Sequence, residues 1–138
     1  MTGERPVHFV EHGGKIALFF DGSGLTSILS EHAWIDDGNV EATVFDTGAA
    51  HHGVAAPWGD YTLVSVPHPE YPTRLPIGIN VLDAEGNVVV DTHGCADLHG
   101  EASSGDLRAI ACAEGLLIVS GSGEPKIEKI DYAGLPEG

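Results

Sequence analysis

The segment HHGVAAPWGDYTLVSV, residues 51–66, contains the pattern that decides the fold of this chain. It begins with two histidines, continues through small residues to a Gly-Asp turn, and ends in a run rich in β-branched residues. Two other segments share the order of a histidine, a small or polar stretch, a glycine turn and an alternating strand, namely HFVEHGGKIALFF at 8–20 and LHGEASSGDLRAIACA at 98–113. The repeat length is about 45 residues, which is typical of modular repeat folds.

Each repeat predicts four antiparallel strands, because a second hairpin follows the first. The second hairpins span 26–48, 76–94 and 115–134, and the first two turn at Asp-Asp-Gly-Asn and Ala-Glu-Gly-Asn. Four strands in about 40 to 50 residues, separated by glycine-rich turns, are typical of one blade of a β-propeller. The expected turns of the first hairpins contain Gly14, Gly59 and Gly105, and the strands after them are expected at 16–20, 61–66 and 107–112.

We therefore predict an all-β chain of three four-stranded antiparallel blades, at about 6–48, 49–96 and 97–138, that form part of a larger β-propeller. A β-sandwich of about twelve short strands is the alternative. The stretch SGLTSILSEHAWI, residues 23–35, could instead be a short helix, because Leu25, Ile28 and Leu29 share helical spacing. We favour a strand there, because the matching stretch PIGINVLDA begins with proline and is β-branched.

The composition limits the classes of partner. With 138 residues, 42% hydrophobic and 20% charged, the chain suits one globular domain. Its 21 acidic and 6 basic residues give a net charge of -15, which disfavours nucleic acid and anionic membranes. No apolar run is long enough for a membrane span, and MTGERPVHFV does not resemble a secretory signal. We expect neither nucleic-acid binding nor membrane insertion.

A propeller would bring equivalent histidines together, because the innermost strand of every blade lines one central channel. We expect these inner strands near residues 7–13, 52–57 and 98–104. His52 and His99 then occupy the same position in neighbouring blades. Their alternative role is that of turn residues that bond to the backbone. His8 is the counterpart in the first blade, but it lacks the His-Gly pair, and we expect it to be structural or exposed.

The segment DTHGCADLHGE, residues 91–101, adds further metal donors. His93 and Asp97 are candidate ligands beside His99, and Asp91 and Glu101 are candidates to orient the imidazole rings. Imidazole nitrogen with carboxylate oxygen suits zinc best, whereas calcium and magnesium require more oxygen donors. The alternative is that these are ordinary loop residues.

Cys95 and Cys112 are the two cysteines, and they do not form a CxxC motif. In the predicted topology, Cys95 enters the third inner strand, and Cys112 ends the strand that returns beside it. A disulfide would indicate an oxidising compartment. Two free buried thiols, or Cys95 as a zinc thiolate, are the alternatives.

The segments FDTGAAHHGVAAPWGDYTLVSV and VDTHGCADLHGEASSGDLRAIACAEGLLIVSG resemble the AztD-type zinc metallochaperones. These are periplasmic bacterial β-propellers that pass zinc to the solute-binding protein of an ABC importer, and the likeness covers nearly the whole chain. The resemblance implies a zinc site of His52, His93, Asp97 and His99, and a Cys95–Cys112 disulfide. Family members have more blades, a secretion signal and a His-rich segment, so we expect this chain to be a portion that pairs with the remaining blades or with another copy.

The expected function is transfer of Zn²⁺ rather than catalysis. Two or three histidines at an open channel mouth leave one coordination position for a ligand of the acceptor, a periplasmic zinc-binding protein of an ABC transporter. Two other functions remain open at this point. One is a metal-free propeller that binds proteins, and the other is a zinc-dependent hydrolase with Glu101 as its base.

Overall fold

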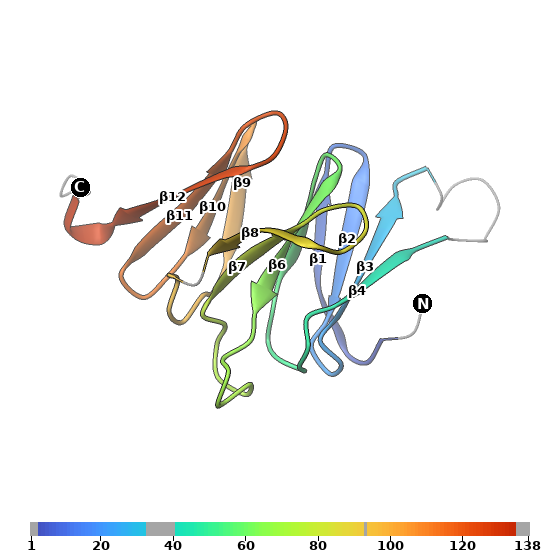
Figure 1. Ribbon diagram of the computed structural model, residues 1–138, viewed down its shortest axis with the longest axis horizontal. Coiled ribbons are helices and arrows are strands. Elements are labelled where there is room, and N and C mark those ends of the chain that lie inside the picture. Colours follow the sequence, from blue (N-terminus) through green and yellow to red (C-terminus); the bar gives the residue numbers. More distant parts are fainter. Residues whose placement is uncertain (1–2, 33–40, 93, 135–138) are drawn as a thin grey trace.

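The computed structural model describes residues 3–32, 41–92 and 94–134, and these residues form three four-stranded sheets (Figure 1). The first sheet contains β1 (Pro6–His12), β2 (Lys15–Phe20), β3 (Leu25–Ser30) and β4 (Thr43–Asp46). The second contains β5 (Ala55–Trp58), β6 (Tyr61–Val66), β7 (Gly78–Leu82) and β8 (Val88–Thr92). The third contains β9 (Glu101–Ser104), β10 (Leu107–Ala111), β11 (Gly115–Ser120) and β12 (Lys126–Asp131), followed by the 3₁₀ turn η1 (Tyr132–Gly134).

Every sheet is an antiparallel meander, in which each strand pairs with the next one along the chain. This confirms the predicted all-β fold of three four-stranded antiparallel units, as expected for part of a propeller. Within the ambiguous stretch, residues 25–30 form strand β3 rather than a helix, and residues 33–35 lie outside the described residues. Among the described residues, no helix has the length and apolar character needed to cross a membrane.

The innermost strands begin later than predicted in the second and third sheets. β5 begins at Ala55 and β9 at Glu101, so His52 and His99 lie in the segments that lead into the strands. Gly100, with φ of 80°, interrupts the extended backbone before β9. At Gly53, a Cβ atom would lie 2.4 Å from Ser65 Oγ and 2.6 Å from His51 Nε2, so only glycine fits.

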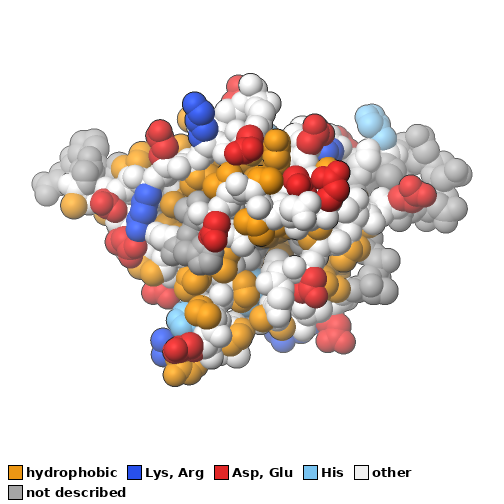
Figure 2. All heavy atoms as spheres, in the orientation of Figure 1, with side chains coloured by type: hydrophobic (Ala, Val, Ile, Leu, Met, Phe, Trp, Pro, Cys, Tyr) orange, Lys and Arg blue, Asp and Glu red, His pale blue; other side chains and the backbone are white. Residues whose placement is uncertain are grey.

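The three sheets lie side by side in a fan (Figure 1). Buried apolar side chains pack between them. The main core joins all three sheets and includes Val10 of β1, Leu63 of β6 and Ile110 of β10. A second core packs Phe19 of β2 against Val64 of β6. Burial of these side chains is the main favourable contribution to folding, at about 25 cal/mol for each Å² of apolar surface. Figure 2 shows acidic side chains spread over the outside of one face, with far fewer basic ones.

A disulfide joins Cys95, in the connection between β8 and β9, to Cys112, directly after β10. The two cysteines are 0% and 5% exposed and belong to the main core. The same connection is also held by backbone hydrogen bonds, from Cys95 N to Ile77 O at 2.9 Å and from Ala113 N to Ala96 O at 2.8 Å. The pairing that the resemblance implied is therefore present, and neither thiol is free.

A buried polar pair fixes the segment before β5. His51 is 3% exposed, and its Nδ1 donates to Ala49 O at 2.8 Å. Its Nε2 therefore accepts a hydrogen bond from Ser65 Oγ, also at 2.8 Å, while Ser65 Oγ accepts one from Val54 N at 3.0 Å. Burial lowers the pKa of His51, and the bond to Ala49 O only partly opposes this effect. His51 is thus a neutral structural residue.

We expect a thiol assay on the unfolded, unreduced protein to detect no free cysteine, and the same assay to detect two after reduction.

Replacing both cysteines, Cys95→Ala with Cys112→Ala, should lower the free energy of unfolding by about 3 kcal/mol, because the disulfide closes a loop across a separation of 17 residues. Urea denaturation measures this change. Two reactive thiols in protein isolated from an oxidising compartment would contradict the pairing.

Stability should fall as the pH drops below about 6.5, the ordinary pKa of His51. The folded state holds this ring neutral, so the unfolded state binds more protons in that range, and the free energy of unfolding rises with pH until the unfolded histidine is neutral too. Urea denaturation at several pH values measures this slope. His51→Asn should reduce it, whereas the exposed His32→Asn should leave it unchanged, and equal slopes in both variants would refute this explanation.

Candidate metal centre

Each of the three sheets contributes one histidine to the same end of the inner strands. His8 lies on β1, His52 precedes β5, and His99 precedes β9. The ring centroids of His8 and His52 are 5.4 Å apart, and those of His52 and His99 are 5.7 Å apart. All three rings line one small cavity together with backbone and apolar atoms of residues that flank them.

Asp21 joins this cluster from the end of β2. Because β2 runs antiparallel to β1, the residue after β2 returns to the end of β1 where His8 lies. Asp21 Oδ2 accepts a hydrogen bond from His52 Nδ1 at 2.6 Å, and the carboxylate side chain is only 12% exposed. This bond selects the tautomer in which His52 Nε2 carries the free lone pair, a common arrangement for a metal-ligating histidine.

The donor atoms are close enough together to bind one ion. One donor atom from each of His8, Asp21 and His52 lies within 4.8 Å of the others. His8 Nδ1 is buried and has no hydrogen-bond partner among the described residues. An unpaired buried nitrogen is costly, and a cation in the cavity would satisfy it. Two imidazoles and a carboxylate suit zinc better than calcium or magnesium.

His99 reaches the cavity from the other side on a short segment, residues 94–100, which we call the His99 arm. His99 N donates a hydrogen bond to Ala111 O of β10 at 3.0 Å. Leu98 N donates one to Pro76 O, in the connection between β6 and β7, at 3.0 Å. The Cys95–Cys112 disulfide fixes its beginning. The side chain of His99 is nevertheless exposed, so it lies at the open edge of the cluster.

The structure brings together two of the four predicted ligands, His52 and His99. Asp97 is exposed, has φ of 51°, and is not among the residues that line the cavity. His93 lies outside the described residues. Glu101, expected to orient a ring, instead pairs with the buried guanidinium of Arg108.

Sequence reasoning missed two members of the cluster. His8 was expected to be structural or exposed, but it lines the cavity next to His52. Its place in the repeat was the signal that could have identified it. Asp21 has no counterpart in the other repeats, and only the antiparallel return of β2 beside β1 indicates its position.

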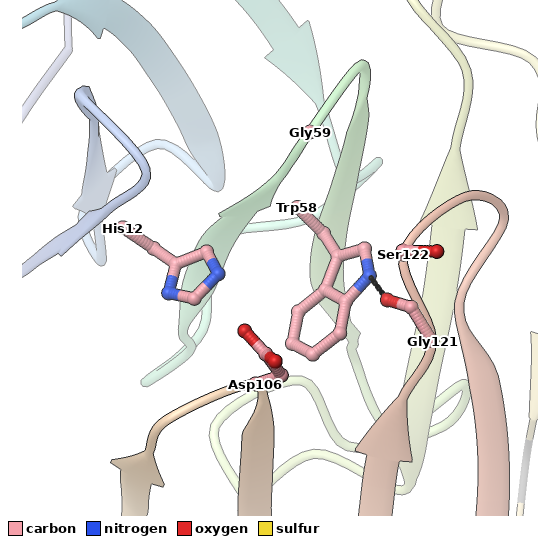
Figure 3. A pocket seen from close by; sticks show the side chains of 6 residues that line it. All are labelled: His12, Trp58, Gly59, Asp106, Gly121 and Ser122. Atoms are coloured by element: carbon pink, nitrogen blue, oxygen red, sulfur yellow. Dashed lines mark hydrogen bonds between the residues drawn. The ribbon is translucent and has the colours of Figure 1, made fainter.

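The opposite end of the inner strands has different chemistry (Figure 3). The His12 ring stacks on Trp58 with centroids 5.3 Å apart, and Trp58 Nε1 donates to Gly121 O at 3.1 Å. Figure 3 also shows Asp106 beside these two rings. Within the part of the chain that the structure describes, the single group of three or more clustered metal-donor side chains is His8, Asp21 and His52. Among the described residues, the clustered metal donors therefore lie at the end that carries His8, His52 and His99.

Comparison with known proteins identifies relatives over the full length of the chain. It is 43% identical to the zinc chaperone AztD of Citrobacter koseri over 140 residues, which include 100% of this chain and 33% of that protein. A crystal structure of Citrobacter koseri AztD superposes with a TM-score of 0.87 at 42% identity, covering 100% of this chain and 37% of that one. The structure of apo AztD from the same organism gives 0.90 at 43% identity and covers 38% of its chain.

No protein-family model matches the sequence. The chain spans about a third of the length of the curated relative that it matches. Both the sequence identity and the backbone similarity extend across all three sheets. The resemblance to the AztD-type proteins is therefore confirmed over the whole chain, which corresponds to about a third of an AztD protein.

Proposed function

We propose that this chain forms the metal-binding part of a periplasmic zinc chaperone, which holds Zn²⁺ and passes it to the zinc-binding protein of an ABC importer. The observation that carries the proposal is the convergence of His8, His52 and His99 from three separate sheets on one cavity. The relationship to the zinc chaperone AztD supports the same cargo. Zinc is the substrate of this reaction, and the protein itself makes or breaks no covalent bond.

The cluster combines a buried side with an open side. The Asp21 side chain is 12% exposed and His8 Nδ1 is buried, whereas the His52 side chain is 41% exposed and His99 is exposed. An acceptor ligand can approach only from the open side. A zinc ion held by the buried donors would exchange His99 or His52 for an acceptor ligand, so that it need not become free in solution. His93 and Asp97 remain candidate ligands on the open side.

Two further features support a periplasmic transfer protein. The buried disulfide suits an oxidising compartment. The net charge of -15 attracts cations and concentrates them near the protein. The proposed acceptor is a protein whose own zinc ligands can reach the open edge of the cluster.

A zinc-dependent hydrolase is less well supported than a chaperone. Glu101, the candidate base, forms an ion pair with Arg108, which is 2% exposed. Proton uptake by Glu101 would leave that buried guanidinium without its counter-charge, which is unfavourable. A carboxylate engaged in this way is a poor general base.

Removing any one of the three histidines should weaken zinc binding. His99→Ala deletes a ligand and should lower zinc affinity at least tenfold, which corresponds to about 1.4 kcal/mol. His8→Ala and His52→Ala should have at least as large an effect, because both histidines lie next to Asp21.

Zinc affinity should also fall as the pH is lowered, since a ligating imidazole must be neutral. Competition with a chromophoric zinc chelator on the full-length protein measures these changes.

The control for these variants is His32→Ala, an exposed histidine that follows β3 at the opposite end of the sheet. It should bind zinc like the unmodified protein. If His99→Ala and His32→Ala bind zinc equally well, His99 is not a ligand and the proposed histidine site is wrong. An unmodified protein that binds no zinc would instead favour the metal-free interaction module.

Asp21→Asn should lower zinc affinity about 10- to 100-fold, because Asp21 orients the His52 ring and its negative charge favours a bound cation. The matched control is Asp46→Asn, whose carboxylate accepts a hydrogen bond from Gly48 N at 2.8 Å in an exposed turn. Circular dichroism should show that both variants keep the β-sheet fold. An Asp21→Asn protein with unchanged zinc affinity would exclude Asp21 from the site.

A further inference from the structure

We infer that the β6–β7 loop, residues 67–77, is the surface on which the zinc-acceptor protein docks. This inference rests on the proposed chaperone function, because it concerns the partner of the same metal site. The loop projects beyond the ends of β6 and β7, clear of the three sheets (Figure 1). It belongs to the second sheet, which has a neighbouring sheet on either side in this chain.

The loop is ordered by its own contacts. Four of its eleven residues are prolines, which restrict the backbone. His68 Nδ1 accepts hydrogen bonds from the backbone N–H groups of Glu70 and Tyr71, at 3.2 Å and 3.1 Å. Arg74 N donates to Tyr71 O at 2.9 Å, which closes a turn. A loop that is already ordered loses little conformational entropy when it binds a partner.

The exposed side chains of the loop are those that dominate protein interfaces. Tyr71 is 52% exposed, and the Arg74 guanidinium lies 4.8 Å from the centre of its ring. The His68 ring is 5.6 Å from the same ring. Tyrosine and arginine are enriched among the residues that contribute most binding energy. Arg74 is also one of only six basic residues in a chain of net charge -15.

The loop lies beside the candidate metal centre. Thr73 lines a surface cavity of about 400 Å³ together with Asp21, His51 and His52. A protein bound to the loop would therefore stand next to the open side of the histidine cluster. A zinc acceptor must approach the open side of the histidine cluster, so its position beside the loop favours a zinc acceptor as the partner over other classes of protein.

The loop is also joined to the His99 arm. Pro76 O accepts a hydrogen bond from Leu98 N at 3.0 Å, and Ile77 O accepts one from Cys95 N at 2.9 Å. Leu98 directly precedes His99, so the docking residues and this histidine belong to one connected backbone network. A partner held by Tyr71 and Arg74 would have a defined orientation relative to His99. Its matching surface should offer a carboxylate for Arg74 beside an apolar hollow for Tyr71.

The test uses the full chain and a purified, zinc-free solute-binding protein of a zinc ABC importer as the probe. Biolayer interferometry measures their affinity, and chelator competition measures zinc affinity. Arg74→Glu and Tyr71→Ala should each weaken docking at least tenfold and leave zinc affinity unchanged. The control for charge reversal is Lys126→Glu, at the exposed start of β12 in the third sheet, which should dock normally.

The possible outcomes separate the docking surface from the chaperone function. If Arg74→Glu and Lys126→Glu dock equally well, or if the unmodified chain binds zinc but does not dock, the docking surface is refuted and zinc binding stands. If the chain docks through Tyr71 and Arg74 but binds no zinc, the docking surface stands and the chaperone function is refuted.

Discussion

Burial of apolar side chains between the three sheets is the constraint on which the candidate site depends. The core residues Val10 and Val54 lie two positions after His8 and His52 in the sequence, and the core residue Leu98 directly precedes His99. In an extended strand, side chains two residues apart point to the same face. The side chain of His8 therefore lies on the same face of β1 as the buried Val10, at the channel end of the strand. Packing of the sheets thus places the three imidazoles together before any metal binds.

Much of the fold follows from the repeat, because strand alternation and turn residues are local properties of the sequence. His52 and His99 were placed together for the same reason, since they recur at equivalent positions. Asp21 was not predicted, because its contact with His52 spans 31 residues and depends on how two sheets pack. His8 was underestimated because its neighbours lack the His-Gly pair, although its position on β1 matches the repeat. Local patterns therefore predict strands better than they predict contacts between sheets.

The histidines next to each other in sequence have opposite roles, and burial explains the difference. His51 is 3% exposed and uses both ring nitrogens to bond with Ala49 and Ser65, so it has no lone pair left for a metal. The His52 side chain is 41% exposed and bonds through Nδ1 alone. The first histidine fixes the backbone, and the second is presented to the cavity. Sequence alone does not distinguish them, because both precede the same glycine.

The connections around His99 bear on how zinc would leave the proposed chaperone. The His99 arm is hydrogen-bonded to Pro76 and Ile77 of the β6–β7 loop and to Ala111 of the third sheet, and it is joined covalently to Cys112. Moving the arm away from the cavity would break several of these bonds, each worth about 0.5 to 1.5 kcal/mol, in addition to the constraint of the disulfide. Rotation of the exposed His99 side chain, or its replacement by an acceptor ligand, costs none of them. Transfer by ligand exchange at a rigid site is therefore favoured over transfer by opening of the arm.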